Sequence, residues 1–369
     1  MNDKEFVGKY GLFATIVVTV VGVGVFSYPS AMASEVGNDG WIVSIIAGII
    51  CFFCLMLMYK VIRKNNFNNL YNIMENTVGK TLGKLLGLIL CVYLIFSISI
   101  GLRVFAEVIK MYLLEQTPTE FILLAMIFTG IALARGEVAA LVKFNEIAFF
   151  VMFIPILIIL MFSTRNGDIT NVLPILQEQP RSYLNAILTS TYAFGGFEII
   201  FLILPFIKEK EKSKITKILF FSIIFIAVFY AVVVILCLMF FSKYHTRELI
   251  WPTITLIRAI VIPGAFIERW EGVVMALWVF FFYTTFVNTY YFAGDILKNV
   301  FSLKDIKLSS TIIAPIVYVV ALYPQNIAEL YDASGKATPY FTLFSFILLP
   351  LILLIFSRTS KGGKKENET

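Results

Sequence analysis

The chain has 369 residues, of which 59% are hydrophobic and only 15% are charged, and its formal net charge is +6. A soluble domain carries charge on about a quarter of its residues, so this composition, with a mean hydropathy of +0.87, excludes a soluble enzyme. The solid apolar runs also argue against a β-barrel, whose strands alternate polar and apolar residues. The sequence therefore predicts an all-α integral membrane protein.

Ten apolar segments follow one another along the chain, and each is a candidate membrane helix because one span takes about 20 residues. They lie near 10–32, 41–62, 84–113, 120–135, 143–163, 185–206, 215–242, 270–297, 309–324 and 338–357. The third is longer than a bilayer requires, which predicts a tilted or projecting helix. We expect a single transmembrane domain over residues 1–369, with five spans in each half (about 10–163 and 185–357) and a polar tail at 358–369.

The basic residues predict the orientation of these spans. With the N-terminus placed inside, the inner connections carry 21 Lys and Arg residues and the outer connections carry 7. Because Lys and Arg concentrate in cytoplasmic loops, both termini are predicted to be cytoplasmic. The net charge is therefore explained by topology and does not indicate nucleic-acid binding. In the longest outer connection, 243–270, Trp251 and Pro252 open an apolar pattern that predicts a short interfacial helix, with Trp251 at the headgroup level.

Two of the ten spans contain a glycine break. Gly22 and Gly24 interrupt the first span, and Gly195 and Gly196 interrupt the sixth. These are the first spans of the two halves, and paired interruptions at matching positions indicate a midplane binding site in a transporter fold built from a 5+5 inverted repeat. The alternative is that small residues simply allow the helices to pack closely.

Unwound backbone in a membrane must find a partner, because lipid satisfies neither N–H nor C=O groups. The half-helix that starts near Val25 and Phe26 presents free N–H groups and the positive end of a helix dipole, which suit a carboxylate. The half-helix that ends near Ala193 and Phe194 presents carbonyls, which suit an ammonium group. Together the two breaks predict a site for an α-amino acid.

Polar side chains on two other spans extend this predicted site. Tyr93 and Ser97 are one turn apart on the third span, and Thr285 and Thr289 are one turn apart on the eighth, whereas Thr284 is expected to face elsewhere. A lone membrane Ser or Thr usually bonds to its own helix, so the helical spacing of each set carries the prediction. The complete predicted ligand-binding set is Gly22, Gly24, Val25, Phe26, Tyr93, Ser97, Phe194, Gly195, Thr285, Asn288 and Thr289.

An ionisable group inside a predicted span is a functional candidate by default, and three such residues are singled out here. Arg103 and Glu107 are four residues apart on the third span, so they form either an internal ion pair or, through Glu107, part of a water or proton path. Glu198 directly follows the second break. It either caps the half-helix, or shapes the cavity and exchanges a proton.

Other chemistry finds no support in the sequence. Cys51, Cys54, Cys91 and Cys237 lie in apolar runs, where a thiol behaves as a small hydrophobe. His245 is the only histidine, so no metal site can be assembled around it. No phosphate-binding loop, nucleotide motif or nucleophile–base pair is found. We therefore expect no enzyme, with no catalytic residue, no cofactor and no metal.

Over nearly its full length the chain resembles the B subunits of GerA-type spore germinant receptors, a branch of the amino acid–polyamine–organocation transporter superfamily. The breaks at Val21–Pro29 and Phe194–Glu198 are shared with amino acid permeases in general. Three segments are more specific to the B subunits, namely Leu204–Lys208, Trp251–Ile254 and Ile267–Glu271.

The resemblance implies a LeuT-like fold and a nutrient sensor in the inner membrane of a bacterial endospore. Such subunits bind a small-molecule germinant, usually an amino acid, and assemble with a larger membrane A subunit and a lipoprotein C subunit. By resemblance, the ligand contacts fall at the two broken helices and at the facing positions of the third and eighth spans. Two alternatives stay open: a proton- or ion-coupled amino acid permease, and a scaffold whose cavity binds nothing.

Overall fold

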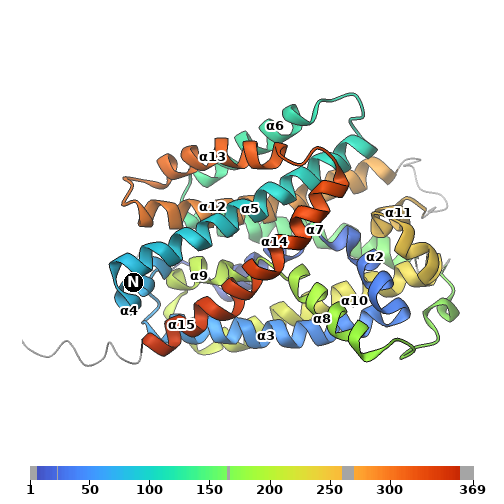
Figure 1. Cartoon of the computed structure of the whole chain (residues 1–369), viewed down its shortest axis with the longest axis horizontal. Helices are drawn as coiled ribbons and strands as arrows, with labels where there is room; N and C mark the ends of the chain where they lie inside the picture. The colour runs from blue at the N-terminus through green and yellow to red at the C-terminus, as the bar shows by residue number, and fades with distance from the viewer. Residues whose placement is uncertain (1–5, 23, 164–166, 260–269, 358–369) are drawn as a thin grey trace, which may run out of the picture.

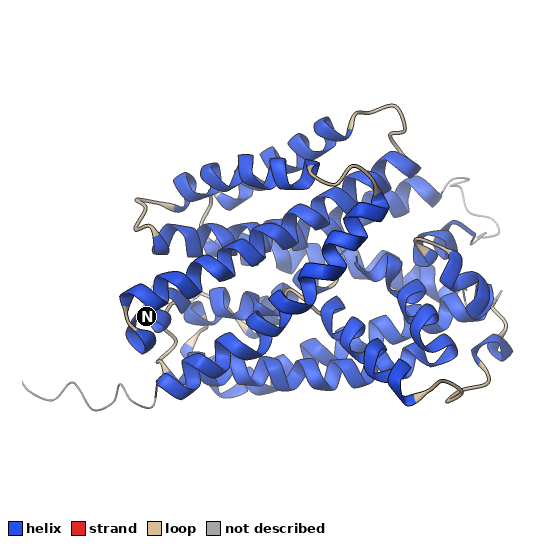
Figure 2. Cartoon of the chain, in the orientation of Figure 1, coloured by secondary structure: helices blue, strands red, loops and turns tan. Residues whose placement is uncertain are grey.

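The computed structural model describes residues 6–22, 24–163, 167–259 and 270–357, with the side chains of residues 270–277 outside that description. Over these residues the chain is helical apart from turns, loops and one isolated parallel bridge between Val7 and Ile207, as Figure 2 shows. The all-α prediction is confirmed. The signature at 267–271 and the tail at 358–369 lie outside the described side chains.

The first half of the chain contains seven α-helices in its described residues. They are α1 (Lys9–Val20), α2 (Gly24–Val36), α3 (Gly40–Lys64), α4 (Leu70–Val78), α5 (Lys80–Tyr112), α6 (Thr119–Ala134) and α7 (Val138–Ser163). A short 3-10 turn, η1 (Gly37–Asp39), joins α2 to α3. At about 1.5 Å per residue, α5 with its 33 residues exceeds the bilayer thickness, as its sequence predicts.

The second half begins with the 3-10 turn η3 (Ile169–Val172) and continues with eight described α-helices. They are α8 (Pro180–Ala193), α9 (Ile200–Ile203), α10 (Ile215–Glu248), α11 (Pro252–Ala259), α12 (Trp270–Val300), α13 (Ile306–Leu322), α14 (Ile327–Leu343) and α15 (Leu349–Phe356). Short turns connect or interrupt them at η4 (Phe197–Ile199), η5 (Leu204–Phe206), η6 (Glu209–Lys214) and the π-turn η7 (Phe344–Leu348).

The length and composition of the helices identify an integral membrane protein. Five segments are long and apolar enough to cross a bilayer, namely Gly24–Lys64, Lys80–Tyr112, Val138–Ser163, Glu209–Glu248 and Ile327–Phe356. Pro180–Ala193 together with Phe197–Phe206 adds a sixth span, bent by 43°. Shorter apolar helices occupy Lys9–Val20, Thr119–Ala134 and Ile306–Leu322. Large apolar side chains such as Phe53 and Phe128, both 67% exposed, point outward, where lipid covers them.

Helix α1 occupies the centre of the bundle and thereby places the first break in the interior. It packs against α7, α10 and α12, while α3 pairs with α10 and α5 pairs with α12 (Figure 1). Nine of its twelve residues are buried, including Thr15 and Thr19. A helix apolar on every face fits such a position, because no side of it meets water.

Both ends of the described chain lie at one end of the bundle. The backbone N–H groups of Phe6 and Val7 donate to Phe206 O, and Lys208 N donates to Val7 O at 3.0 Å. At the same end, Lys64 at the end of α3 donates to Leu354 O of α15, and Figure 1 shows α4 and the end of α15 there. Lys212 lies over the Phe67 ring at 4.8 Å, so two Lys-rich connections that the sequence assigns to the inner side, 60–84 and 208–217, are neighbours in space.

The structure corrects several boundaries. Helix α4 was not expected, and α14 starts at Ile327 rather than near 338 because the Asn326 side chain accepts a hydrogen bond from Glu329 N and caps the helix. Hydropathy misses this polar first half. The seventh segment bends at Ser242 (φ 60°), near its expected end, and then continues to Glu248.

Trp251 packs against the protein, and its expected position at the headgroup level stays a prediction. The helix α11 does follow it, but the Trp251 ring is only 3% exposed and packs edge-on against Tyr112 at a centroid distance of 6.0 Å. The aromatic pair joins α11 to the end of α5. The Trp251 ring therefore contributes to the packing between these two elements.

Candidate functional site

The first and sixth spans are both interrupted where their glycines predict. Helix α1 ends at Val20, and Val21 at its C-cap leaves the helical region with ψ 82°. Helix α8 ends at Ala193, and the chain resumes helical structure only at Phe197. The two interruptions release backbone groups in the middle of the bundle.

The two breaks are in contact with each other. Gly196 has φ +111°, and a Cβ atom built on it would lie 3.0 Å from Thr19 O at the end of α1. A side chain at this position would meet both a strained backbone conformation and the facing backbone. Glycine at 196 is therefore required by the close approach of the two broken spans.

Replacing Gly196 with alanine should lower the free energy of unfolding by about 1–2 kcal/mol or more, because a left-handed conformation costs an L-residue about that much. The measurement is thermal unfolding of the purified protein in detergent. Gly335→Ala is the matched control, since Gly335 is helical and a Cβ there meets no atom within 4 Å. Equal stability of the two variants would contradict the contact.

Helix α12 closes over the first break. A Cβ atom on Gly22 would lie only 2.5 Å from Thr285 Oγ1. The Thr285 hydroxyl donates to Thr19 O at 2.9 Å, and the Thr284 hydroxyl donates to Val18 O at 2.9 Å. The expectation that Thr284 faces elsewhere is therefore wrong. The last carbonyls of a helix have no donor within the helix. Two adjacent threonines of α12 can therefore bond to two successive carbonyls at the end of α1.

A tyrosine that the sequence did not single out joins the two breaks. The Tyr230 hydroxyl from α10 donates to Ala193 O at 3.1 Å and lies 3.4 Å from Val20 O. These are the terminal carbonyls of the two interrupted half-helices, and Ala193 is the one assigned to an ammonium group. A single tyrosine in a long apolar run has no spacing signal, so sequence reasoning could not have found it.

Glu198 links the second break to the third span. It is 3% exposed; its Oε1 accepts from the Tyr93 hydroxyl at 2.9 Å, and its Oε2 accepts from Gly196 N at 2.8 Å. The hydroxyls of Ser97 and Ser345 also interact with the Tyr93 hydroxyl. The capping role expected for Glu198 is thus observed, and its role in shaping a cavity or exchanging a proton stays a prediction.

Asn288 lies in a buried amide network rather than free on the predicted face. Its Nδ2 donates to Thr19 Oγ1 at 2.7 Å and to Asn145 Oδ1 at 3.1 Å, and its Oδ1 accepts from Asn145 Nδ2 at 2.9 Å. Both asparagines are fully buried. Their side chains tie α12 and α7 to α1, the first part of the interrupted first span. Asn145, like Tyr230, was missed because its partners lie far away in sequence.

Two predicted aromatic residues use their rings for packing. The ring of Phe26 packs edge-on against Trp278 and Phe281 at centroid distances of 6.0 and 6.1 Å. The ring of Phe194 packs edge-on against Tyr230 at 5.3 Å. Any contact of these two residues with a ligand therefore falls to their backbone atoms.

Val25 and Thr289 are also buried in the described structure. Val25 is 1% exposed, and its carbonyl accepts from the Thr253 hydroxyl of α11 at 3.0 Å. Thr289 is 8% exposed and follows Thr285 by one turn on α12. These placements leave the backbone at the start of α2 as the part of the break that can meet a ligand.

Open space adjoins the start of α2. Gly24 is exposed although Val25 and Phe26 beside it are buried, and a Cβ on Gly24 would meet no atom within 4 Å. One turn further on, Ser27 lines a cavity of about 350 Å³. The other lining residues are Ser30, Ala31, Arg247, Glu248, Leu249, Ile250 and Tyr331. This volume lies at the lower end of the range for small-molecule sites.

Arg103 and Glu107 form the internal ion pair that was one of their two expected roles. Arg103 Nε lies 3.0 Å from Glu107 Oε1, without the alignment of a hydrogen bond, and Nη2 donates to Gln325 O at 3.4 Å. The water or proton path stays a prediction. Among the described residues, no group of three or more His, Cys, Asp or Glu side chains is placed to hold a metal ion.

The proteins with similar sequences are spore germination proteins. A family model described as "Spore germination protein" matches residues 7–330. Spore germination protein A2 of Bacillus subtilis (strain 168) is 30% identical over 362 residues, covering 96% of both chains. Spore germination protein GerQB of Bacillus cereus is 24% identical over 351 residues, covering 95% of both.

Solved structures of transporters share the fold. MHP1, a nucleobase-cation-symport-1 family transporter in a closed conformation with bromovinylhydantoin bound, matches with a TM-score of 0.67 at 11% identity, over 97% of this chain and 93% of that one. A Na+-coupled sialic acid symporter in a substrate-bound outward-open state matches with a TM-score of 0.64 at 9% identity, over 96% and 88%. At these identities the likeness shows the fold alone.

Proposed function

The chain belongs to the spore germination protein family, and from this membership we propose that it is the germinant-binding subunit of a spore germinant receptor. Its family and fold are those of receptor and transporter proteins, not of enzymes. The observation that carries the proposal is the meeting of the two broken spans, Gly196 against Thr19, beside the accessible backbone of Gly24.

An amino acid is the proposed ligand because the backbone groups at the two breaks suit a carboxylate and an ammonium group. Helix α2 is 13 residues long, and the N–H groups of its first turn have no partner within the helix, so they attract a carboxylate. Carbonyls at the ends of α1 and α8, together with the Glu198 carboxylate, are acceptors for an ammonium group. An α-amino acid carries both groups at one carbon, which suits two breaks in contact.

Signalling requires that the ligand bind one conformation more tightly than another, because only differential affinity shifts an equilibrium. The Tyr230 hydroxyl and the threonines of α12 cover the carbonyls of the breaks in the present arrangement. A ligand ammonium that replaces Tyr230 at Ala193 O would release α10 from the break. We propose that this rearrangement is passed to a membrane A subunit and a lipoprotein C subunit.

The membrane arrangement belongs to the same proposal. Ten spans result when α1–α2, α8–α9 and α14–α15 each count as one interrupted span, with inverted repeats over about 10–163 and 185–357. Clustering of the Lys-rich connections at one end of the bundle supports cytoplasmic termini. We place the protein in the spore inner membrane.

The proposal is tested by equilibrium binding of a panel of radiolabelled amino acids to the purified protein in lipid nanodiscs. We expect saturable binding of a small subset, and no concentrative uptake of the same amino acids into proteoliposomes under a proton or sodium gradient. If the protein has normal thermal stability but binds none of the amino acids, the result would favour a scaffold whose cavity binds no ligand.

An ion-coupled amino acid permease is the second candidate. The hydroxyls of Thr284 and Thr285 meet the carbonyls of Val18, Thr19 and Phe281 at 2.9–3.4 Å. These two hydroxyl and three carbonyl oxygens form a cluster of the ligand type that hard cations prefer. Gradient-driven uptake by this chain alone, abolished in Thr284→Val/Thr285→Val, would establish the permease and exclude the pure sensor.

A further inference from the structure

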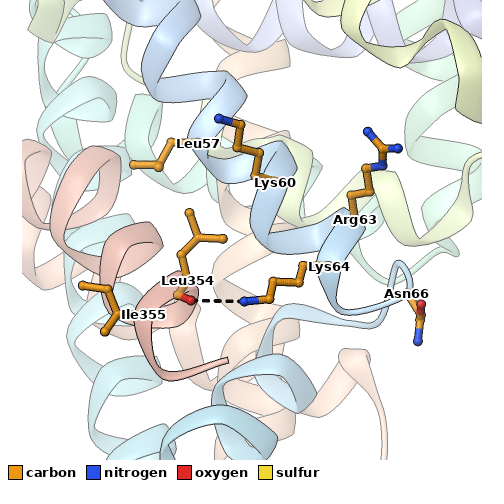
Figure 3. A pocket seen from close by; sticks show the side chains of 7 residues that line it. All are labelled: Leu57, Lys60, Arg63, Lys64, Asn66, Leu354 and Ile355. Atoms are coloured by element: carbon orange, nitrogen blue, oxygen red, sulfur yellow. Dashed lines mark hydrogen bonds between the residues drawn. The ribbon is translucent and has the colours of Figure 1, made fainter. Parts of the chain in front are cut away.

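A second hollow lies at the end of the bundle, where the end of α3 meets the end of α15. Its volume is about 870 Å³, and Leu57, Lys60, Arg63, Lys64, Asn66, Leu354 and Ile355 line it. Figure 3 shows Lys64 reaching across from α3 toward Leu354 O, with Lys60 and Leu57 on the adjoining turns. The hollow is therefore built from two helices that are about 290 residues apart in sequence.

The charge of this hollow is positive and uncompensated. Three of its seven lining residues are cations and none is acidic. Within the described part of the chain, Lys60, Arg63 and Lys64 take part in no salt bridge. The hydrogen bond of Lys64 to Leu354 O, at 3.4 Å, leaves its charge without a counter-ion. Such a site attracts an anion.

The other residues around the hollow are apolar on one side, and a smaller polar hollow adjoins it. Leu57, Leu354 and Ile355 are hydrophobic, and Ile355 is 63% exposed on the lipid-facing side of α15. A smaller hollow of about 200 Å³ shares Lys64 and Asn66 with the first. Its other lining residues are Asn65, Asn68, Asn76, Thr77 and Ser357. The amides and hydroxyls there suit the oxygens of a polar headgroup.

Two simpler causes account for the cations but not for the rest. Lys and Arg mark the cytoplasmic ends of spans, and cations at a helix C-terminus complement its dipole. Neither cause requires a concave site or an apolar wall beside the charges. Basic pockets between membrane helices at the cytoplasmic side are a recurrent form of headgroup recognition.

We propose that this hollow binds an anionic phospholipid, with its phosphate held by Lys60 and Lys64 and an acyl chain along Leu57 and Leu354. Arg63 adds positive charge at the rim, on the far side of α3 in Figure 3. The lipid would join α15 to α3 and α4 at the end of the bundle.

The test is native mass spectrometry of the detergent-purified full chain titrated with phosphatidylglycerol, phosphatidylcholine or glycerol 1-phosphate. We expect phosphatidylglycerol to bind the native chain and Lys60→Gln/Lys64→Gln to bind it on the order of 20-fold more weakly, at about fivefold per cation. Lys304→Gln/Lys307→Gln is the matched control, because both lysines are exposed at the junction of α12 and α13. The control should bind like the native chain.

Other outcomes overturn the proposal. Equal affinity for phosphatidylcholine would show that the hollow is an apolar groove with no preference for anionic lipid. Unchanged binding by Lys60→Gln/Lys64→Gln would show that the lipid does not bind at this hollow. Glycerol 1-phosphate competing as well as the lipid, with no effect of Leu57→Trp, would assign the hollow to a soluble anion. If the double variant fails to fold by its melting curve, Lys60→Gln decides alone, since Lys60 is exposed.

Discussion

Replacing Gly24 with leucine should raise the germinant concentration for half-maximal germination by about tenfold or more, with the subunit at its normal level in spore membranes. A Cβ on Gly24 meets no protein atom within 4 Å, and its φ is not in the left-handed region, so the backbone tolerates a side chain. The leucine fills the space beside the break and excludes the ligand carboxylate from the N–H groups of α2. A tenfold loss corresponds to about 1.4 kcal/mol of binding free energy.

The measurement is the germination rate of spores across a concentration series of an amino acid panel, with subunit levels checked by immunoblot. Gly8→Leu is the matched control, because Gly8 also has open space around its Cβ and lies at the start of α1, at the opposite end of that helix from the break. An unchanged threshold for Gly24→Leu would refute the ligand site at the first break.

Gly22 is a poorer probe, although the sequence draws equal attention to it. Its Cβ would lie 2.5 Å from Thr285 Oγ1, so any side chain pushes α12 away from α1. Loss of germination in Gly22→Leu would therefore combine misfolding with loss of the ligand. Only the packing around each glycine distinguishes the two positions.

The second large effect is expected at Glu198. Glu198→Ala removes the acceptor of two buried donors, the Tyr93 hydroxyl and Gly196 N–H. Each unsatisfied buried donor costs about 1–3 kcal/mol, so the free energy of unfolding should fall by about 2–6 kcal/mol. Glu198→Gln retains one acceptor oxygen and should lose less.

Thermal unfolding in detergent measures both Glu198 variants, with Glu120→Ala as control because Glu120 is exposed at the start of α6. The same variants separate structure from signalling. If Glu198→Gln folds with near-native stability yet no longer responds to any germinant, the carboxylate acts in the response itself. A germination threshold that tracks stability alone would assign Glu198 to capping.

A transporter fold suits a sensor because its two interrupted spans couple a small ligand to large helices. In this chain, α1 contacts α7, α10 and α12 at once, and hydroxyls from α10 and α12 end on its last carbonyls. Movement at the break therefore reaches three long elements directly. The buried Asn145–Asn288 pair holds α7 to α12 beside α1.

What the sequence determined by itself is local or compositional. Sustained apolar runs require a membrane, and glycine pairs release the helix at the residues that carry them, so the class of the protein and the two breaks could be predicted. The ion pair of Arg103 with Glu107 could be predicted for the same reason, because residues four apart lie one helical turn apart on the same face. The family resemblance followed from short segments that can be compared without a structure.

What only the tertiary structure decided is which distant groups meet. Tyr230 reaches Ala193 and Val20, Asn145 pairs with Asn288, and Thr284 faces α1, over separations of 37 to 266 residues. The start of α14 was missed because a capping side chain, and not hydropathy, begins that helix. Buried hydrogen-bond partners are chosen by the crossing and rotation of packed helices, and no periodicity within a single span records either.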